Sequence, residues 1–154
     1  MNEKPSYLGL LNSISLGETR AGVYLSCWAS VTPNPEVQKV LRTIALRESE
    51  HGLAFEKRID ELGYCVVDRP DPEQDAKLAI ASSTSLSDRE KFEKLNLGRR
   101  QEAGKPDVFD RFFENKDFDP ATGGLLGRYI AEERSSGRMF ADCYEALCSG
   151  ESCE

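Results

Sequence analysis

The sequence has little or none of several features that mark common protein classes. It contains a single histidine, His51, and its five cysteines form no C-x-x-C pair, so neither a zinc site nor a disulfide framework is indicated. No apolar run reaches the roughly 18 residues that a membrane span needs. Strand-like alternation of apolar and polar residues is also missing, which leaves helical spacing as the dominant pattern and predicts an all-α protein.

Positive charge is in short supply as well. Lysine and arginine number 20 against 27 aspartates and glutamates, which gives a formal net charge of −7. Binding to a phosphate backbone or an anionic membrane requires a basic face, so we expect no nucleic-acid partner and no membrane partner. The N-terminal stretch MNEKPSYLGLLNS lacks the apolar core of a signal peptide. We therefore expect a cytoplasmic protein, and its 154 residues are typical of a single domain.

Apolar residues recur at helical spacing in four segments. The first covers about 7–30, and the second begins at Asn34 as N-cap, has Pro35 at its first position and ends at Gly63. The third starts at Ser87, which forms a predicted capping box with Glu90, and continues to about residue 113. The fourth starts at DPATGG and continues to about residue 147. Four such segments predict an antiparallel four-helix bundle.

The connections between these segments differ in composition. Residues 64–87 contain prolines, a short helical patch and a serine-rich run, which predicts a crossover between the second and third helices. Pro106 lies inside the third segment and is expected to break that helix into two pieces. Residues 149–154 read as a flexible tail. Cys148 and Cys153 lie in or beside it, whereas Cys27 and Cys143 fall within helical patterns and are interpreted as small core residues.

Carboxylates interrupt the apolar stripes in register. Glu18 lies on the stripe of the first segment, and Glu48 with His51 forms a Glu-x-x-His on the stripe of the second. The two halves of the chain also resemble each other, because the fourth segment can be aligned on the second with Glu133 opposite Glu48. Aligning the third segment on the first places Glu102 opposite Glu18. Four glutamates and one imidazole are therefore expected to face one another inside the bundle.

Several carboxylates buried together are costly, because each loses its hydration and like charges repel. Bound cations, protons or neighbouring arginines must neutralise them. Carboxylate oxygens combined with imidazole suit iron or manganese, so a metal site accounts for the pattern most economically. A metal-free bundle that is held by ion pairs instead remains an alternative, and Arg99, one turn before Glu102, supplies a suitable positive charge.

The stretches LGETRAGVYLSCWA and LRESEHGLAFEKRIDELG resemble the first two helices of rubrerythrin-like members of the ferritin-like superfamily. The general plan of such sites is a glutamate from each of two helices and a Glu-x-x-His from each of the other two. The resemblance implies that Glu18, Glu48, His51, Glu102 and Glu133 are ligands of two metal ions. It departs from the family at Ser136, where a histidine is expected, so metal bound on that side should be held more weakly.

Two ligand assignments stay open on the sequence alone. Glu132 replaces Glu133 as the inward residue if the fourth helix is rotated slightly, and Glu90 or Glu93 replaces Glu102 if Pro106 shortens the third helix. Tyr24 and Tyr129 are candidates for lining an oxidant pocket.

The resemblance implies a non-haem di-iron oxidoreductase acting on peroxide or dioxygen. Because no C-x-x-C module follows the bundle, such an enzyme needs a separate electron donor. A homodimer paired along an apolar outer face is also expected. Two other functions remain open: a ferroxidase or iron-handling protein, in which iron is the substrate, and a metal-free helical module for oligomerisation or partner binding.

Overall fold

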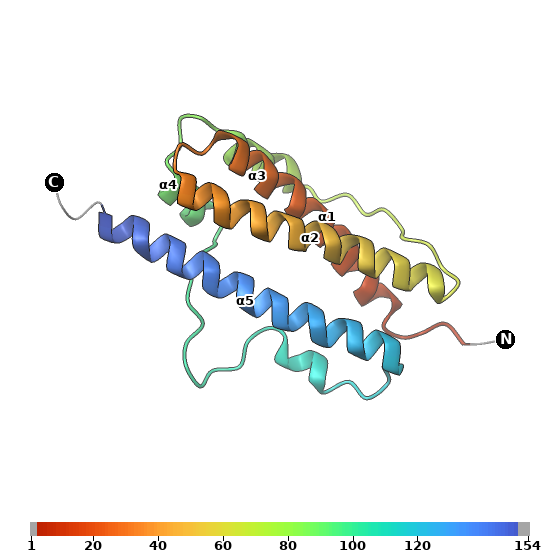
Figure 1. The fold of residues 1–154 in the computed structure, drawn as a ribbon. Helices are drawn as coiled ribbons and strands as arrows, with labels where there is room; N and C mark the ends of the chain where they lie inside the picture. Colours follow the sequence, from red (N-terminus) through yellow and green to blue (C-terminus); the bar gives the residue numbers. More distant parts are fainter. Residues whose placement is uncertain (1–2, 151–154) are drawn as a thin grey trace.

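The computed structural model describes residues 3–150, and within them it is helical with no strand. Three long helices dominate it: α1 (Leu8–Val31), α2 (Pro35–Glu61) and α5 (Pro120–Gly150). Between α2 and α5 the chain forms short helices: α3 (Gln74–Ser82), α4 (Asp88–Lys94) and the 3-10 turn η1 (Asp110–Phe113). Figure 1 shows α2 antiparallel to both α1 and α5, with α3 and α4 gathered near the N-terminal end of α2. No helix in the described range is long and apolar enough to cross a membrane.

Two helix starts confirm the capping residues that the sequence predicts. The side chain of Asn34 accepts hydrogen bonds from the backbone N–H groups of Glu36 and Val37, which otherwise have no partner in the first turn of α2. Ser87 and Glu90 form a reciprocal capping box at the start of α4. Both arrangements are local, because the donors and acceptors lie within three residues of each other.

The third long helix does not form. α4 ends at Lys94, and the backbone then turns through left-handed conformations at Asn96 (φ 55°) and Gly98 (φ 78°). The N–H of Leu97 donates to the carbonyl of Phe92 at 2.9 Å and closes the helix end. The expected break at Pro106 is thus preceded by an earlier one, and most of residues 95–119 are loop. The expectation of four long helices is corrected to three, with a short helix and a loop in place of the expected third helix.

The segment between α2 and α4 runs back along α1. The side chain of Asn12 donates to the carbonyl of Val67 at 2.9 Å near the start of α1, and Asp88 accepts from the indole of Trp28 at 2.7 Å near its end. At the other end of the chain, α5 extends to Gly150, so the first two residues of the expected tail are helical. The rest of that tail, Cys153 included, lies outside the described residues.

The interior consists of two apolar clusters with a polar layer between them. One cluster lies where the end of α1 meets the start of α2, and it includes Leu25, Trp28, Leu41, Ile44, Phe92 and Phe140. The other lies at the opposite end of the long helices and includes Leu11, Ile14, Phe55, Ile59, Tyr129 and Ile130. Along each long helix, the charged residues predicted to bind metal fall between a member of one cluster and a member of the other. This layer is therefore enclosed by apolar side chains on both sides.

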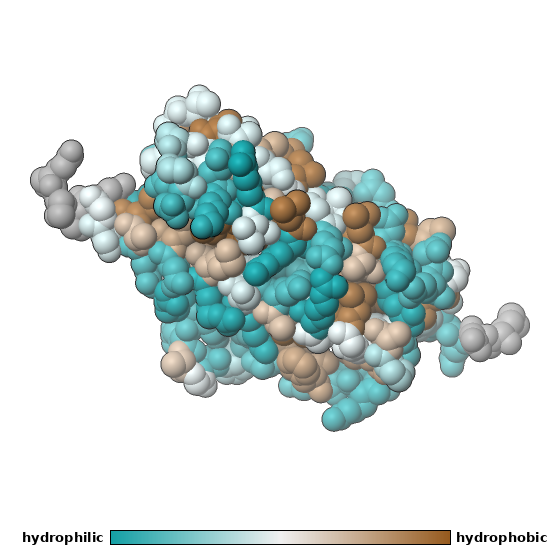
Figure 2. Space-filling view, viewed as in Figure 1, coloured by the Kyte–Doolittle hydropathy of each residue, from teal (hydrophilic) through white to brown (hydrophobic). Residues whose placement is uncertain are grey.

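Polar residues cover most of the surface face drawn in Figure 2, and apolar residues form small separate groups on it. Leu46 and Leu53 on α2 remain 72% and 67% exposed, which is high for leucine. The homodimer that was expected to pair along an apolar outer face stays a prediction.

The turn after α4 gives a test of this fold. A Cβ added at Gly98 would lie 2.7 Å from the Cβ of Tyr144 on α5. The φ of Gly98, +78°, already disfavours any residue with a side chain. We expect Gly98→Ala to lower the free energy of unfolding by about 2–4 kcal/mol in denaturant titrations, the sum of left-handed strain and steric overlap. Gly104→Ala is the matched control, because Gly104 has φ +77° with open space around it and should lose only about 1–2 kcal/mol. Equal losses for the two variants would contradict the close packing of this turn on α5.

Candidate metal centre

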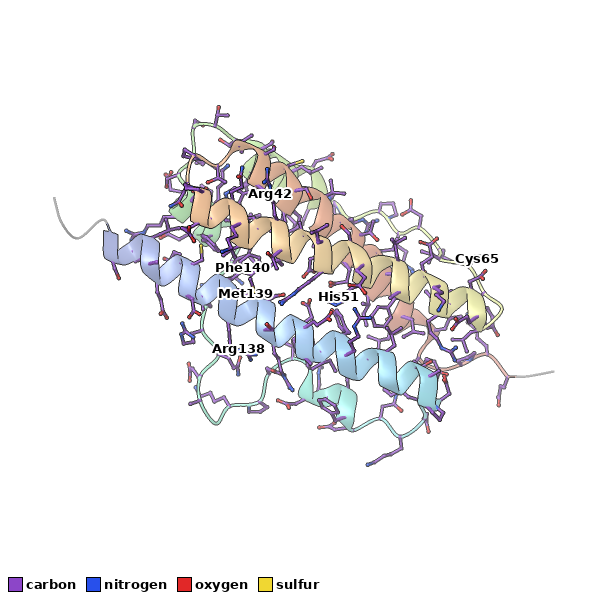
Figure 3. The ribbon with its side chains drawn as sticks, in the orientation of Figure 1. Arg42, His51, Cys65, Arg138, Met139 and Phe140 are labelled. Carbon is purple, nitrogen blue, oxygen red and sulfur yellow. The ribbon has the colours of Figure 1, made fainter. Side chains whose placement is uncertain are left out.

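Three long helices bring four of the five predicted ligands to one point. Glu18 comes from α1, Glu48 and His51 from α2, and Glu133 from α5. One ligand atom from each residue lies within 4.8 Å of the other three, and Glu18, Glu48 and His51 are buried. Figure 3 shows His51 in the layer between α2 and α5. The sequence prediction that carboxylates converge on the single imidazole is therefore met for this group.

The close approach of α1 and α2 sets the position of the group. A Cβ at Gly52 would overlap the hydroxyl of Thr19 and lie 3.1 Å from its backbone nitrogen, so only glycine allows this separation. The hydroxyl of Ser15 donates to the carbonyl of Gly52 at 2.9 Å and ties the two helices together. Because Gly52 follows His51 directly, this contact holds the imidazole opposite the first helix.

The two nitrogens of His51 have different surroundings. Nδ1 faces the carboxylates of Glu18 at 3.4 Å and Glu133 at 3.5 Å, whereas Nε2 lies 2.5 Å from Oε2 of Glu132. Burial disfavours the charged ring, but the three carboxylates outweigh it and raise the pKa of His51 from 6.5 to about 10. Without metal the imidazole is therefore a cation at neutral pH. With metal on Nδ1, the same Glu132 carboxylate would accept the proton of Nε2, the arrangement that commonly orients a histidine ligand.

The three carboxylates of the group differ in their environments. Glu18 accepts a hydrogen bond from the hydroxyl of Tyr129 at 3.1 Å; although burial opposes its charge, hydrogen bonds from His51 and other neighbours lower the pKa of Glu18. Burial and the adjacent Glu18 and Glu133 raise the pKa of Glu48 from 4.5 to about 11, so Glu48 carries a proton at neutral pH. Burial and the same carboxylates also raise the pKa of Tyr24 to about 12. Without a metal ion, protons on Glu48 and His51 therefore reduce the negative charge of the site.

One atom of the group has no hydrogen-bond partner. Oε1 of Glu133 is fully buried and accepts no hydrogen bond from any described residue; its nearest cationic atom is Nδ1 of His51 at 3.5 Å. A buried carboxylate oxygen without a hydrogen bond is costly and uncommon. It faces the other ligand atoms, which is the position that an oxygen ligand of a metal ion would occupy.

The separations within the group fit a single ion. Metal bonds to nitrogen and carboxylate oxygen are about 2.1 Å long, so ligand atoms on opposite sides of one ion lie about 4.2 Å apart. A set of four atoms within 4.8 Å needs only small side-chain rotations to reach that geometry. Carboxylate oxygens are hard ligands and imidazole nitrogen is a borderline one. This ligand set suits iron or manganese, whereas copper(I) prefers the soft sulfur ligands that the group lacks.

The second half of the expected site is built differently. Ser136 is buried, and its hydroxyl accepts a hydrogen bond from Nη1 of Arg47 at 3.1 Å. The same guanidinium nitrogen lies 3.3 Å from the hydroxyl of Ser135 and 3.5 Å from the sulfur of Met139. A fixed positive charge therefore lies where the second histidine was expected. Arg47 was not among the residues predicted to form the site, although its position four residues before His51 places it on the same face of α2.

Glu102 does not join the group. It lies in the loop after α4, its side chain is 68% exposed, and it pairs with Lys105. The expectation for Glu102 fails because it required a continuous third helix, which ends at Lys94. The alternatives Glu90 and Glu93 do not replace it, since Glu90 caps α4 and Glu93 accepts from Tyr144 at 3.0 Å. Arg99 is exposed in the same loop and makes no ion pair among the described residues.

The choice between the two adjacent glutamates of α5 is also decided. Glu133 belongs to the group of four, whereas Glu132 lies on the outer side of His51 and also accepts from Arg128 at 3.2 Å. Both residues therefore contact the imidazole, one from each side.

Comparisons of the chain with protein-family models, with curated proteins and with solved structures give no match.

The protonation of Glu48 predicts how the metal-free protein responds to pH. Because the folded-state pKa is raised, the contribution of Glu48 to stability is greatest below about pH 4.5 and is lost progressively as pH rises toward 11. We expect Glu48→Gln, which mimics the protonated carboxyl, to raise the free energy of unfolding by at least about 1 kcal/mol at pH 8 in chelator, and by less at pH 5. Denaturant titrations at the two pH values measure this. Glu56→Gln, an exposed change on the same helix, is the control. A loss of stability at pH 8 would instead mean that ionised Glu48 is paired with a cation.

Proposed function

We propose that this chain is a ferritin-like metal-binding protein that holds one divalent ion, iron or manganese, through Glu18, Glu48, His51 and Glu133. The observation that carries the proposal is the convergence of these four side chains within 4.8 Å, three of them buried, with Oε1 of Glu133 lacking a hydrogen-bond partner. An apolar cluster on each side limits the access of water to the group. Such burial is costly for a metal-free protein and favourable for one that binds a cation.

Each residue has a distinct role in this proposal. Tyr129 holds one oxygen of Glu18 and leaves the other facing His51. Glu132 holds Nε2 of His51 and leaves Nδ1 for the ion. Glu48 and His51 must each release a proton before binding, so metal affinity should rise with pH.

A bound iron or manganese ion would supply one-electron redox chemistry, which is the basis for proposing a peroxide- or dioxygen-linked oxidoreductase. The phenols of Tyr24 and Tyr129 border the group, and their raised pKa values keep both hydroxyls protonated. The proton of Tyr129 is donated to Glu18, which leaves the hydroxyl of Tyr24 as the one to donate a hydrogen bond to an oxidant. This enzyme would work with a separate electron donor and, by the expectation above, as a homodimer. In the alternative function, a ferroxidase, iron is the substrate: it is oxidised at the site and then released.

The dinuclear form of the rubrerythrin-like site has less support. Two of its ligand positions are changed: Ser136 replaces a histidine and contacts Arg47, and Glu102 lies in an exposed loop. A second divalent ion near Arg47 would be repelled by the guanidinium charge. We therefore favour one ion per chain.

Metal titration tests this proposal. We expect anaerobic Fe(II) or Mn(II) to bind with a stoichiometry near one per chain, and His51→Ala or Glu133→Gln to weaken binding at least tenfold, because each removes a direct ligand. Calorimetry and elemental analysis after gel filtration give the stoichiometry. Glu102→Gln removes an equivalent charge outside the group and should leave the affinity unchanged. If protein from metal-supplemented cells contains no metal and binds none in titration, the metal-free helical module is the better assignment.

The degenerate half gives a second test. We expect Ser136→His to leave the stoichiometry near one, because Arg47 keeps its charge beside position 136 and no carboxylate replaces Glu102. The same calorimetric titration measures it. A stoichiometry of two in this variant would show that only the histidine is missing and that the dinuclear geometry is otherwise intact.

A further inference from the structure

The loop that replaces the third long helix encloses a cavity against α5. Its volume is about 730 Å³, within the range of pockets that bind small organic molecules. The cavity is bounded by residues 99–109 on one side and by α5 on the other, and Glu133 is part of its wall. It therefore reaches the metal-binding group from the side opposite to α1 and α2. Figure 1 shows this loop as a wide arch beside α5.

Ion pairs at both ends hold the arch in place. Arg100 pairs with Asp142 at 2.6 Å and with Glu145 at 2.8 Å at one end. At the other end Arg134 forms two hydrogen bonds with Asp107, at 2.7 and 3.0 Å. Between these points the amide of Gln101 donates to the carbonyl of Lys105 at 3.0 Å and stabilises the bend. These contacts fix the loop against α5 and so maintain the cavity between them.

The charge of the lining is opposite to that of the protein. Five of its side chains are basic and three are acidic, although the whole chain carries −7. Two of the acidic groups are already paired: Glu102 with Lys105, and Asp107 with Arg134. The third, Glu133, belongs to the metal-binding group.

Two guanidinium groups in the lining have no such partner. Within residues 3–150, neither Arg99 nor Arg138 makes a hydrogen bond or an ion pair. Arg138 projects from α5, and Figure 3 labels it on the side of that helix toward the loop. Arg99 comes from the loop itself, so the two charges reach the same cavity from different elements. Guanidinium forks recognise carboxylate and phosphate groups through paired hydrogen bonds.

The rest of the wall is apolar. Pro106, Val108 and Phe109 from the loop and Ala141 from α5 line the cavity, and Val108 is 66% exposed. A ligand with an anionic head and a short apolar body matches this combination of surfaces.

We infer that this cavity binds a small organic oxyanion, with its carboxylate or phosphate head on Arg99 and Arg138 and its apolar part against Val108 and Phe109. The binding itself does not depend on metal. That such an anion is a substrate or regulator of the neighbouring site rests on the proposed function, because Glu133 belongs both to the cavity wall and to the metal-binding group.

The test uses the full chain in chelator, so that its outcome is separate from that of metal titration. Hexanoate, hexyl phosphate and neutral 1-hexanol are titrated by calorimetry and by amide chemical shifts. We expect at least one of the two anions to bind in the millimolar range or tighter, with shifts at residues 99–109, and 1-hexanol to bind at least tenfold more weakly. The stronger of the two anions identifies the preferred head group.

Substitutions locate the anion. Arg99→Gln combined with Arg138→Gln should weaken binding of the preferred anion at least tenfold. Arg42→Gln, which removes an exposed charge on α2 outside the cavity, should leave it unchanged, and Figure 3 shows Arg42 well away from Arg138. Circular dichroism checks that each variant is folded. Absence of anion binding, equal binding of 1-hexanol, or equal weakening by the control would each overturn the inference, and none of them bears on metal binding.

Discussion

The gathering of three carboxylates, two of them buried and one partly buried, around one imidazole is the constraint on which the rest of this structure depends. Glu18, Glu48 and Glu133 repel one another in a region that apolar clusters enclose on two sides. Two pKa shifts reduce their cost: burial and the neighbouring carboxylates raise the pKa of Glu48 so that it keeps a proton, and the carboxylates raise the pKa of His51 so that it is a cation. Both protons lie on residues that we propose as metal ligands. In the proposed metal-bound state, one ion would replace these protons.

The two halves of the protein differ in the charged side chains that they bring to the interior. The half built by α1 and α2 keeps its carboxylates and its imidazole, supported by Tyr129 and Glu132 from α5. In the other half, Arg47 lies beside Ser136, and the segment with Glu102, the fourth carboxylate expected from the sequence, is a loop. The hydroxyl of Ser136 accepts a hydrogen bond from the Arg47 guanidinium, so both polar groups are satisfied without a second set of carboxylates. Because a loop and not a long helix packs against α5 here, a cavity forms between them, and Arg99 and Arg138 line it.

Helical periodicity and capping chemistry made much of this architecture predictable. The starts of α2 at Pro35 and of α4 at Asp88 follow from side chains that bond to backbone groups within three residues. The placement of Glu18, Glu48 and His51 on inward faces follows from their register with apolar neighbours on the same helix. The internal resemblance of the two halves correctly brought Glu133 to the group. It failed for Glu102, because a resemblance between segments cannot show that one of them ends in a left-handed turn at Asn96 and Gly98.

The sequence by itself determined the helical class, the inward faces of the long helices and the presence of carboxylates among apolar residues, because these depend on spacing along a single helix. Only the tertiary structure decided which carboxylates meet, that Glu132 and Glu133 contact His51 from opposite sides, and that Arg47 reaches Ser136 from another helix. Those contacts depend on how far apart two helices lie and how each is rotated. Such distances are set by residues like Gly52, whose effect appears only when a second backbone packs against it.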